Sequence, residues 1–285
     1  MQRAVLILSA AILCLGMDAY GWAPATHAYL AERITGSQDP DIIYGSMVVD
    51  FYGAVLFNKA ANDALHHMTH FDFEWLEPST FATGFATHNG AWGADYYAHL
   101  YYDKTAEPIY SVRKLRQMSS EFNITMQQAE DSWEGIIEFL VRLEYGPELG
   151  VLIQQSASGS THEEALVEAF AQPLAKKTGL SVEEASTEIR KAARAYQTLA
   201  LTYGQQLAMD QDYLRRLAVI AIRAYLGCDL ETAKRYFERG IEISRDDYKQ
   251  EMDRICENIR AKMISMPQYA THCTPSAAAP ERGDP

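Results

Sequence analysis

Residues 84–103, GFATHNGAWGADYYAHLYYD, place three potential metal ligands in one segment. On an α-helix of about 3.6 residues per turn, the spacing of His88, Asp95 and His99 would bring all three side chains onto one stripe. Imidazole and carboxylate groups are ligands that suit zinc. A buried polar stripe satisfied by hydrogen bonds would show the same pattern, so the interpretation depends on the rest of the chain.

The composition predicts one folded domain. The chain has 285 residues, of which 48% are hydrophobic, enough for a sizeable core with at most a small appendage. Its formal net charge of -13 argues against duplex nucleic acid and against loose binding to anionic lipid headgroups. An anionic substrate held by bound cations is compatible with this charge, because a metal ion inverts the local field.

Residues 1–21 have the pattern of a cleaved signal peptide. Arg3 precedes an apolar run that is too short for a comfortable membrane span, and small residues precede a cleavage point after Gly21. Cleavage there would make the protein secreted or periplasmic and leave Trp22 as its N-terminus. An uncleaved N-terminal anchor is the alternative.

Candidate ligands follow directly after this cleavage point. A free α-amine at Trp22 and its carbonyl can chelate a metal, and His27 lies at the start of an expected helix, where a capping or surface position is the alternative. Asp50 is the one charge in the apolar segment 42–57, and a buried carboxylate needs a metal, an arginine or backbone donors. A helix-capping role near Gly53 explains Asp50 equally well.

Two further histidine positions attract attention. His66, His67 and His70 crowd together, and positions 67 and 70 can face the same way on a helix; a merely polar surface turn is the alternative. His162 stands in the first turn of a later expected helix, where a solvated side chain and a ligand of a further zinc are equally reasonable.

Apolar spacing of three and four residues after position 103 indicates an all-α scaffold. Gly and Ser residues suggest a break over 146–159, and we expect capping boxes at Thr161–Glu164 and Ser181–Glu184. The expected helices cover residues 118–143, 181–208, 210–226 and 229–264.

Two features close the chain. The segment 267–285 has the composition of a disordered tail, which leaves 22–266 as the folded domain. Three cysteines remain after cleavage, and a Cys228–Cys256 disulfide would tie the last two helices in an oxidising compartment.

The order of the candidate ligands resembles that of the bacterial zinc-dependent phospholipase C family and of the related single-strand nuclease family, which share one all-helical fold. The resemblance covers residues 22–103 and includes the opening Trp-x-Pro-x-Thr-His pattern, here Trp22 to His27. It implies a single multi-helix domain of the phospholipase C/P1 nuclease type, with extra helices at the C-terminus.

The resemblance also implies a ligand set for two or three zinc ions. Trp22 and His27 would bind one zinc, and Asp95 would bridge it to a second. His67 is the substitute for His70, and the family's later His-x-x-x-Glu pair has no clean match here. The full implied set is Trp22, His27, Asp50, His70, His88, Asp95, His99 and His162.

One departure from the family pattern makes a structural prediction. The family places its histidine and aspartate one turn apart, whereas His88 and Asp95 would lie about 10 Å apart along a straight helix. Gly90 and Gly93 stand between them. We therefore expect a break in the helix that brings the two side chains together.

The implied activity is phosphodiester hydrolysis by a secreted, zinc-dependent enzyme of the phospholipase C type. Clustered zinc would neutralise phosphate oxygens and activate a water for attack on phosphorus, with Asp50 as a ligand or as general base. The substrate would be a phospholipid or another phosphodiester. A nuclease or nucleotidase on the same cluster is one alternative, and a non-catalytic periplasmic metal-binding protein is another.

Overall fold

Every regular element of the described residues is helical. The computed structural model describes residues 23–54, 59–98 and 110–273, and within these ranges it contains no strand, which confirms the all-α expectation. Two short elements, η2 (Phe51–Ala54) and η3 (Phe73–Trp75), are 3₁₀ helices. The α-helices are α2 (Pro24–Thr35), α3 (Pro40–Val48), α4 (Lys59–Phe71), α5 (Thr80–His88), α6 (Ala94–Ala98), α7 (Tyr110–Phe122), α8 (Met126–Tyr145), α9 (Glu148–Ala157), α10 (Glu163–Thr178), α11 (Val182–Leu207), α12 (Gln211–Leu226), α13 (Leu230–Ser244), α14 (Tyr248–Ile264) and α15 (Pro267–Ala270).

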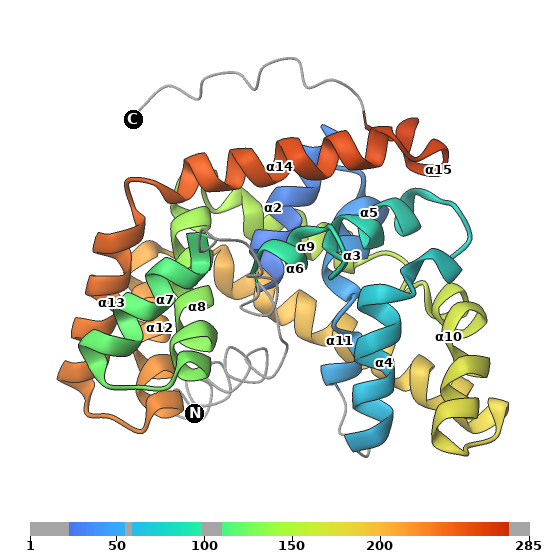
Figure 1. Ribbon diagram of the computed structural model, residues 1–285, viewed down its shortest axis with the longest axis horizontal. Helices are drawn as coiled ribbons and strands as arrows, with labels where there is room; N and C mark the ends of the chain where they lie inside the picture. The colour runs from blue at the N-terminus through green and yellow to red at the C-terminus, as the bar shows by residue number, and fades with distance from the viewer. Residues whose placement is uncertain (1–22, 55–58, 99–109, 274–285) are drawn as a thin grey trace.

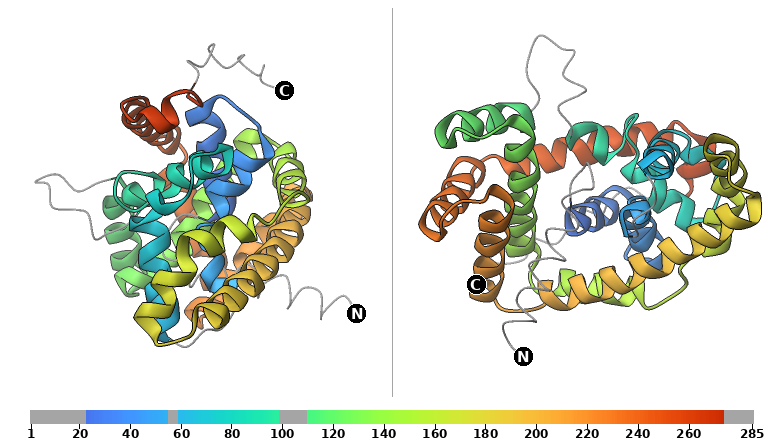
Figure 2. Two further views of the ribbon diagram at one scale, coloured as in Figure 1. Left: turned by 90° about the vertical axis from the view of Figure 1, so that its right-hand side faces the viewer. Right: turned by 90° about the horizontal axis from the view of Figure 1, so that it is seen from below.

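The N-terminal helices α2 and α3 lie in the middle of the molecule. Helix α14 crosses over them on one side, and the long helix α11 runs along the opposite side (Figures 1 and 2). Helix α2 packs against α3, α5, α8, α9 and α14. The first two helices are therefore enclosed by later parts of the chain, and all apolar residues of α2 are buried.

Helices α3 and α5 form the closest packed pair in this centre. A Cβ atom on Gly45 would lie 2.4 Å from the carbonyl oxygen of Phe81, and one on Gly84 would lie 2.0 Å from that of Ile42. Side chains larger than hydrogen at these two positions would push the helices apart. The pair of glycines thus sets the distance between α3 and α5 where the two helices are in contact.

Capping residues mark several helix starts, and those at 181 and 210 agree with the sequence-based expectations. Asp39 caps α3, with its side chain accepting from the Asp41 amide and Pro40 in the first turn. The expected capping box at Ser181 is confirmed, and α11 continues to Leu207. Helix α12 starts after the capping residue Asp210.

Two of the expected long helices are each split in two. The segment 118–143 divides at Asn123, whose φ of 52° is left-handed and ends α7 before Thr125 caps α8. The segment 229–264 divides between α13 and α14. At this second corner Tyr110 donates a hydrogen bond to Asp247, 2.8 Å away, and the Trp133 indole donates one to Ser244, 3.0 Å away.

Two other local expectations were wrong. The segment 146–159 contains α9, because Leu149, Leu152 and Ile153 bury an apolar face. The capping box at Thr161 is absent, since the capping residue of α10 is His162 and no side chain caps that helix.

The C-terminal part of the chain also departs from expectation. The folded part continues past residue 266 to Cys273, because Tyr269 and Cys273 are buried. The residues of the tail beyond 273 lie outside the described ranges. The Cys228–Cys256 disulfide is not formed, and all three cysteines at positions 228, 256 and 273 are free. Among the described helices, none combines the length and the apolar character that crossing a membrane requires.

Candidate metal centre

Five of the candidate ligands come from five consecutive parts of the fold. His27 lies in α2, Asp50 follows α3, His70 stands near the end of α4, His88 is the last residue of α5 and Asp95 lies in α6. Trp22 and His99 lie outside the described residues, so the structure does not place them.

The helix between His88 and Asp95 is broken, as predicted. Helix α5 ends at His88 and α6 begins at Ala94. The side chain of Asn89 accepts hydrogen bonds from the amides of Ala91 and Trp92, each 2.9 Å away, and this closes the turn. A Cβ atom on Gly93 would lie 2.6 Å from the carbonyl carbon of His88, so only glycine fits there.

The break brings the side chains of His88 and Asp95 together with those of His70 and Asp50. The Nε2 atom of His70 lies 3.4 Å from Asp50 Oδ1 and 3.8 Å from Asp95 Oδ2. The Nε2 atom of His88 lies 3.8 Å from Asp50 Oδ2 and 4.0 Å from Asp95 Oδ1. We call these four residues the central ligand set.

These separations fit a shared metal ion better than direct hydrogen bonds. They all exceed about 3.2 Å, the upper end of ordinary N–H···O distances. A tetrahedral zinc with bonds of about 2.0–2.2 Å separates its ligand atoms by about 3.3–3.6 Å; the His70–Asp50 separation lies in this range, and the other three are up to about half an ångström longer. Two carboxylates and two neutral imidazoles carry a charge of about -2, which one divalent ion balances. Within the central ligand set, His70, His88 and Asp95 bring their ligand atoms within 4.8 Å of one another and could therefore hold a metal ion.

Backbone carbonyls orient both imidazoles of the set. The Nδ1 atom of His88 lies 2.8 Å from the carbonyl oxygen of Ser46, and that of His70 lies 3.0 Å from the carbonyl oxygen of His66. Because a carbonyl only accepts hydrogen bonds, each Nδ1 carries the proton, and in the neutral ring Nε2 keeps its lone pair. Both Nε2 atoms thus face the carboxylates in the form that binds metals.

His27 joins a second group with two members of the central set. One ligand atom each of His27, Asp50 and His88 lie within 4.8 Å of one another. The rings of His27 and His88 stack in parallel, with centroids 3.7 Å apart. Asp50 is the carboxylate of this second group, whereas Asp95 is grouped with His70 and His88.

His67 and His162 lie apart from the central ligand set, whereas the ring of His66 lies against that of His70, with centroids 4.5 Å apart. His67 is exposed and stacks on Phe71, so it is no substitute for His70. The Nε2 atom of His162 lies 2.9 Å from Asp41 Oδ1, and its ring stacks on Phe81 with centroids 4.1 Å apart. The structure therefore gives His162 a partner on α3 and places it in neither group of candidate metal ligands.

Sequence reasoning missed the groups that support the ligands. Tyr196 of α11 donates a hydrogen bond to the carbonyl oxygen of Met47, 2.5 Å away, just before the chain turns at Asp50. Glu138 of α8 is buried and binds the first turn of α2. Glu138 could have been noticed in the sequence, because it is a carboxylate on the apolar face of α8. The backbone carbonyls of Ser46 and His66 could not, because every residue has one whatever its side chain.

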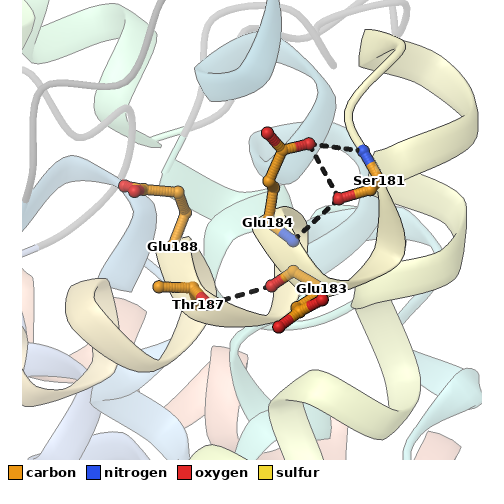
Figure 3. Close-up of a pocket in the computed structure, with 5 residues that line it drawn as sticks. All are labelled: Ser181, Glu183, Glu184, Thr187 and Glu188. Carbon is orange, nitrogen blue, oxygen red and sulfur yellow. Dashed lines mark hydrogen bonds between the residues drawn. The ribbon is translucent and has the colours of Figure 1, made fainter.

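A shallow surface hollow lies far from this centre in the sequence, at the start of α11 (Figure 3). Two of its five lining residues, Ser181 and Glu184, form the capping box and bind each other's amides. Thr187 donates a hydrogen bond to the carbonyl oxygen of Glu183, 2.9 Å away. Helix capping therefore accounts for these polar contacts, and the central ligand set remains the candidate site.

Comparison with known proteins identified no relative of the chain. No model of a known protein family, no curated protein and no solved structure matches the chain.

Proposed function

We propose that this chain is a secreted zinc-dependent phosphodiester hydrolase of the phospholipase C type. The observation that supports the proposal most is the convergence of Asp50, His70, His88 and Asp95 from four separate parts of the chain. The resemblance of the ordered ligands to the phospholipase C family agrees with it. The proposal includes the family's helical fold type.

Each residue of the set has a role in the proposed reaction. His70, His88 and Asp95 are almost fully buried and would hold zinc. When bound, zinc would neutralise phosphate oxygens and acidify a coordinated water. Asp50 has 11% of its side chain exposed, compared with 2% for Asp95. Asp50 is therefore the carboxylate best placed to accept the proton of an attacking water.

Metal analysis and a diesterase assay test this proposal together. We expect the purified mature protein to contain zinc and to hydrolyse bis(p-nitrophenyl) phosphate, with loss of both zinc and activity after chelation. Phosphatidylcholine vesicles and single-stranded DNA then separate a phospholipase from a nuclease or nucleotidase on the same residues. Zinc-free protein with full activity would contradict the proposal.

The burial of the ligands favours a second candidate, a non-catalytic metal-binding protein. His70 and His88 have no exposed surface, and structural zinc sites are closed in this way, whereas catalytic sites keep an open position. Stoichiometric zinc without hydrolysis of any phosphodiester would support this second candidate.

Export of the protein is a further part of the proposal. The expected signal peptide and Trp22 lie outside the described residues, so their roles remain predictions. N-terminal sequencing of protein recovered from the periplasm or the medium should start at Trp22. Any other start would remove the amine and carbonyl of Trp22 from the proposed ligands.

A further inference from the structure

A buried carboxylate from α8 binds the first turn of α2. The Oε1 atom of Glu138 accepts a hydrogen bond from the Ala25 amide, 2.7 Å away. Its Oε2 atom accepts from the amide and the hydroxyl of Thr26, at 2.9 Å and 2.7 Å. Glu138 is 4% exposed and Thr26 is fully buried, so these bonds are made inside the protein.

This carboxylate takes the place of a local helix cap. The first amides of a helix have no partner within it, and the capping residue Ala23 has no side chain that could accept from them. The first turn of α2 is thus held by a residue more than a hundred positions away in the sequence.

The held turn carries a candidate metal ligand. His27 directly follows Thr26, and its ring stacks on that of His88 at 3.7 Å. At its other end α2 is held by Arg260 of α14, which donates hydrogen bonds to the carbonyl oxygens of Ile34 and Arg33. The two ends of α2 therefore have separate supports, and only the Glu138 support lies beside the metal centre.

We propose that Glu138 is a positioning residue of the metal centre, which acts through the first turn of α2 to keep His27 against His88. This inference rests on the proposed zinc centre for its functional meaning. The geometric part, that Glu138 sets the position of the His27 ring, concerns the protein without metal as well.

Three variants of the mature protein test the proposal. Glu138→Gln replaces one of the two acceptor oxygens with a donor, Thr26→Val removes the hydroxyl alone, and Arg260→Gln weakens the other end of α2 as a control. Competition with a chelator measures zinc affinity, and a crystal structure of each metal-free variant measures the His27–His88 stacking.

We expect Glu138→Gln to weaken zinc binding by about 10–100-fold, the usual effect of losing a group that supports a ligand, and to disrupt the stacking. Thr26→Val should reduce zinc affinity and disturb the stacking to a smaller extent. If Glu138→Gln does not fold, the Thr26 variant tests the proposal in its place. Arg260→Gln should lower the melting temperature while zinc affinity and stacking stay unchanged.

Two results would overturn this role of Glu138. One is wild-type zinc affinity and intact stacking in both the Glu138 and Thr26 variants. The other is an equal disturbance in the Arg260 variant, which would assign the effect to α2 as a whole. If the wild-type protein binds no zinc, the proposed function is wrong. The stacking of His27 on His88 in the metal-free variants still tests whether Glu138 positions His27.

Discussion

At the scale of single residues, the orientation of a side chain distinguishes histidines that look alike in the sequence. His67 and His70 belong to the same helix, α4, yet His67 is exposed and His70 is completely buried. Only His70 has its Nδ1 atom held by a backbone carbonyl, that of His66, so that Nε2 points at Asp50. The two residues therefore form a natural pair of test and control.

Replacing these two histidines by alanine should have opposite consequences for metal binding. His70→Ala removes one ligand of the central set, and we expect zinc affinity to fall by at least about 100-fold, beyond the loss from a supporting group. His67→Ala removes an exposed ring and should leave zinc affinity within about twofold of wild type. Titration with a zinc-selective chromophore measures both; an equal loss in the two variants would exclude His70 as a specific ligand.

Because the pKa of the Glu138 carboxyl is raised, we expect the stability of the protein to depend on pH. Burial raises its pKa to about 7, and the donors on Thr26 and Ala25 oppose this rise only in part. Because its pKa is higher in the folded than in the unfolded protein, its stabilising contribution is complete below about pH 4.5 and is lost as the pH rises through about 7.

Chemical denaturation of the metal-free protein tests this dependence. Between about pH 5 and pH 8 we expect the unfolding free energy of wild type to fall by about 1–3 kcal/mol relative to Glu138→Gln. If the unfolding free energy of wild type minus that of Glu138→Gln stays constant or grows with pH, the carboxylate of Glu138 is ionised throughout this pH range.

At the scale of elements, the turn between α5 and α6 decides whether the ligands meet. Residues 89–93 form the turn that separates α5 from α6, and the amide of Gly90 donates a hydrogen bond to the carbonyl oxygen of His70, 2.9 Å away. This bond ties the turn to α4. The same short segment therefore positions ligands from α4, α5 and α6.

Gly93→Ala should disturb this turn. The added methyl group would meet backbone atoms of His88 and Asn89, which cannot move aside cheaply, so we expect a loss of about 1–3 kcal/mol in unfolding free energy together with weaker zinc binding. Gly135→Ala, in α8 with open space around the new Cβ, should instead stabilise by about 0.5–1 kcal/mol. Urea unfolding compares the two, and a neutral Gly93→Ala would contradict the close approach.

The two expected capping boxes also make a test at this scale. Ser181→Ala removes a cap that the structure contains, and we expect it to cost about 1 kcal/mol. Thr161→Ala removes a residue that caps nothing, and its effect should stay within about 0.5 kcal/mol. Thermal unfolding measures the loss of stability in each variant. Equal losses in the two variants would mean that Thr161 caps α10.

At the scale of the whole molecule, the candidate metal centre joins the N-terminal half of the fold. Its ligands come from α2, the turn after α3, α4, α5 and α6, while α12 and α13 supply none. A bound ion would add a further connection between these elements. Metal binding should therefore stabilise one half of the molecule more than the other.

Removal of zinc should expose this asymmetry. Zinc at about 100 times its dissociation constant contributes about 2.7 kcal/mol to the folded state, so chelation should lower the melting temperature and zinc should restore it. Hydrogen exchange should accelerate in α2 to α6 and stay unchanged in α12 and α13. Uniform acceleration throughout the chain would argue against a local metal centre.

Much of the fold could be predicted from local residue patterns, because capping and periodicity act between near neighbours. Asp39, Ser181 and Asp210 mark helix starts that the structure contains. The corner between α13 and α14 could not be predicted in this way. No glycine or proline marks it, and side chains from α7 and α8, among them Tyr110 and Trp133, bind it.

By itself, the sequence determined the helical class, the main helix starts and the identity of the candidate ligands, including the need for a break between His88 and Asp95. Tertiary structure alone decided which histidine of α4 faces inward, that Asp50 lies with His27, and that Glu138 holds α2. The reason is physical: helix signals depend on a few adjacent residues, whereas the direction and partner of a buried polar group depend on carbonyls and carboxylates from distant helices.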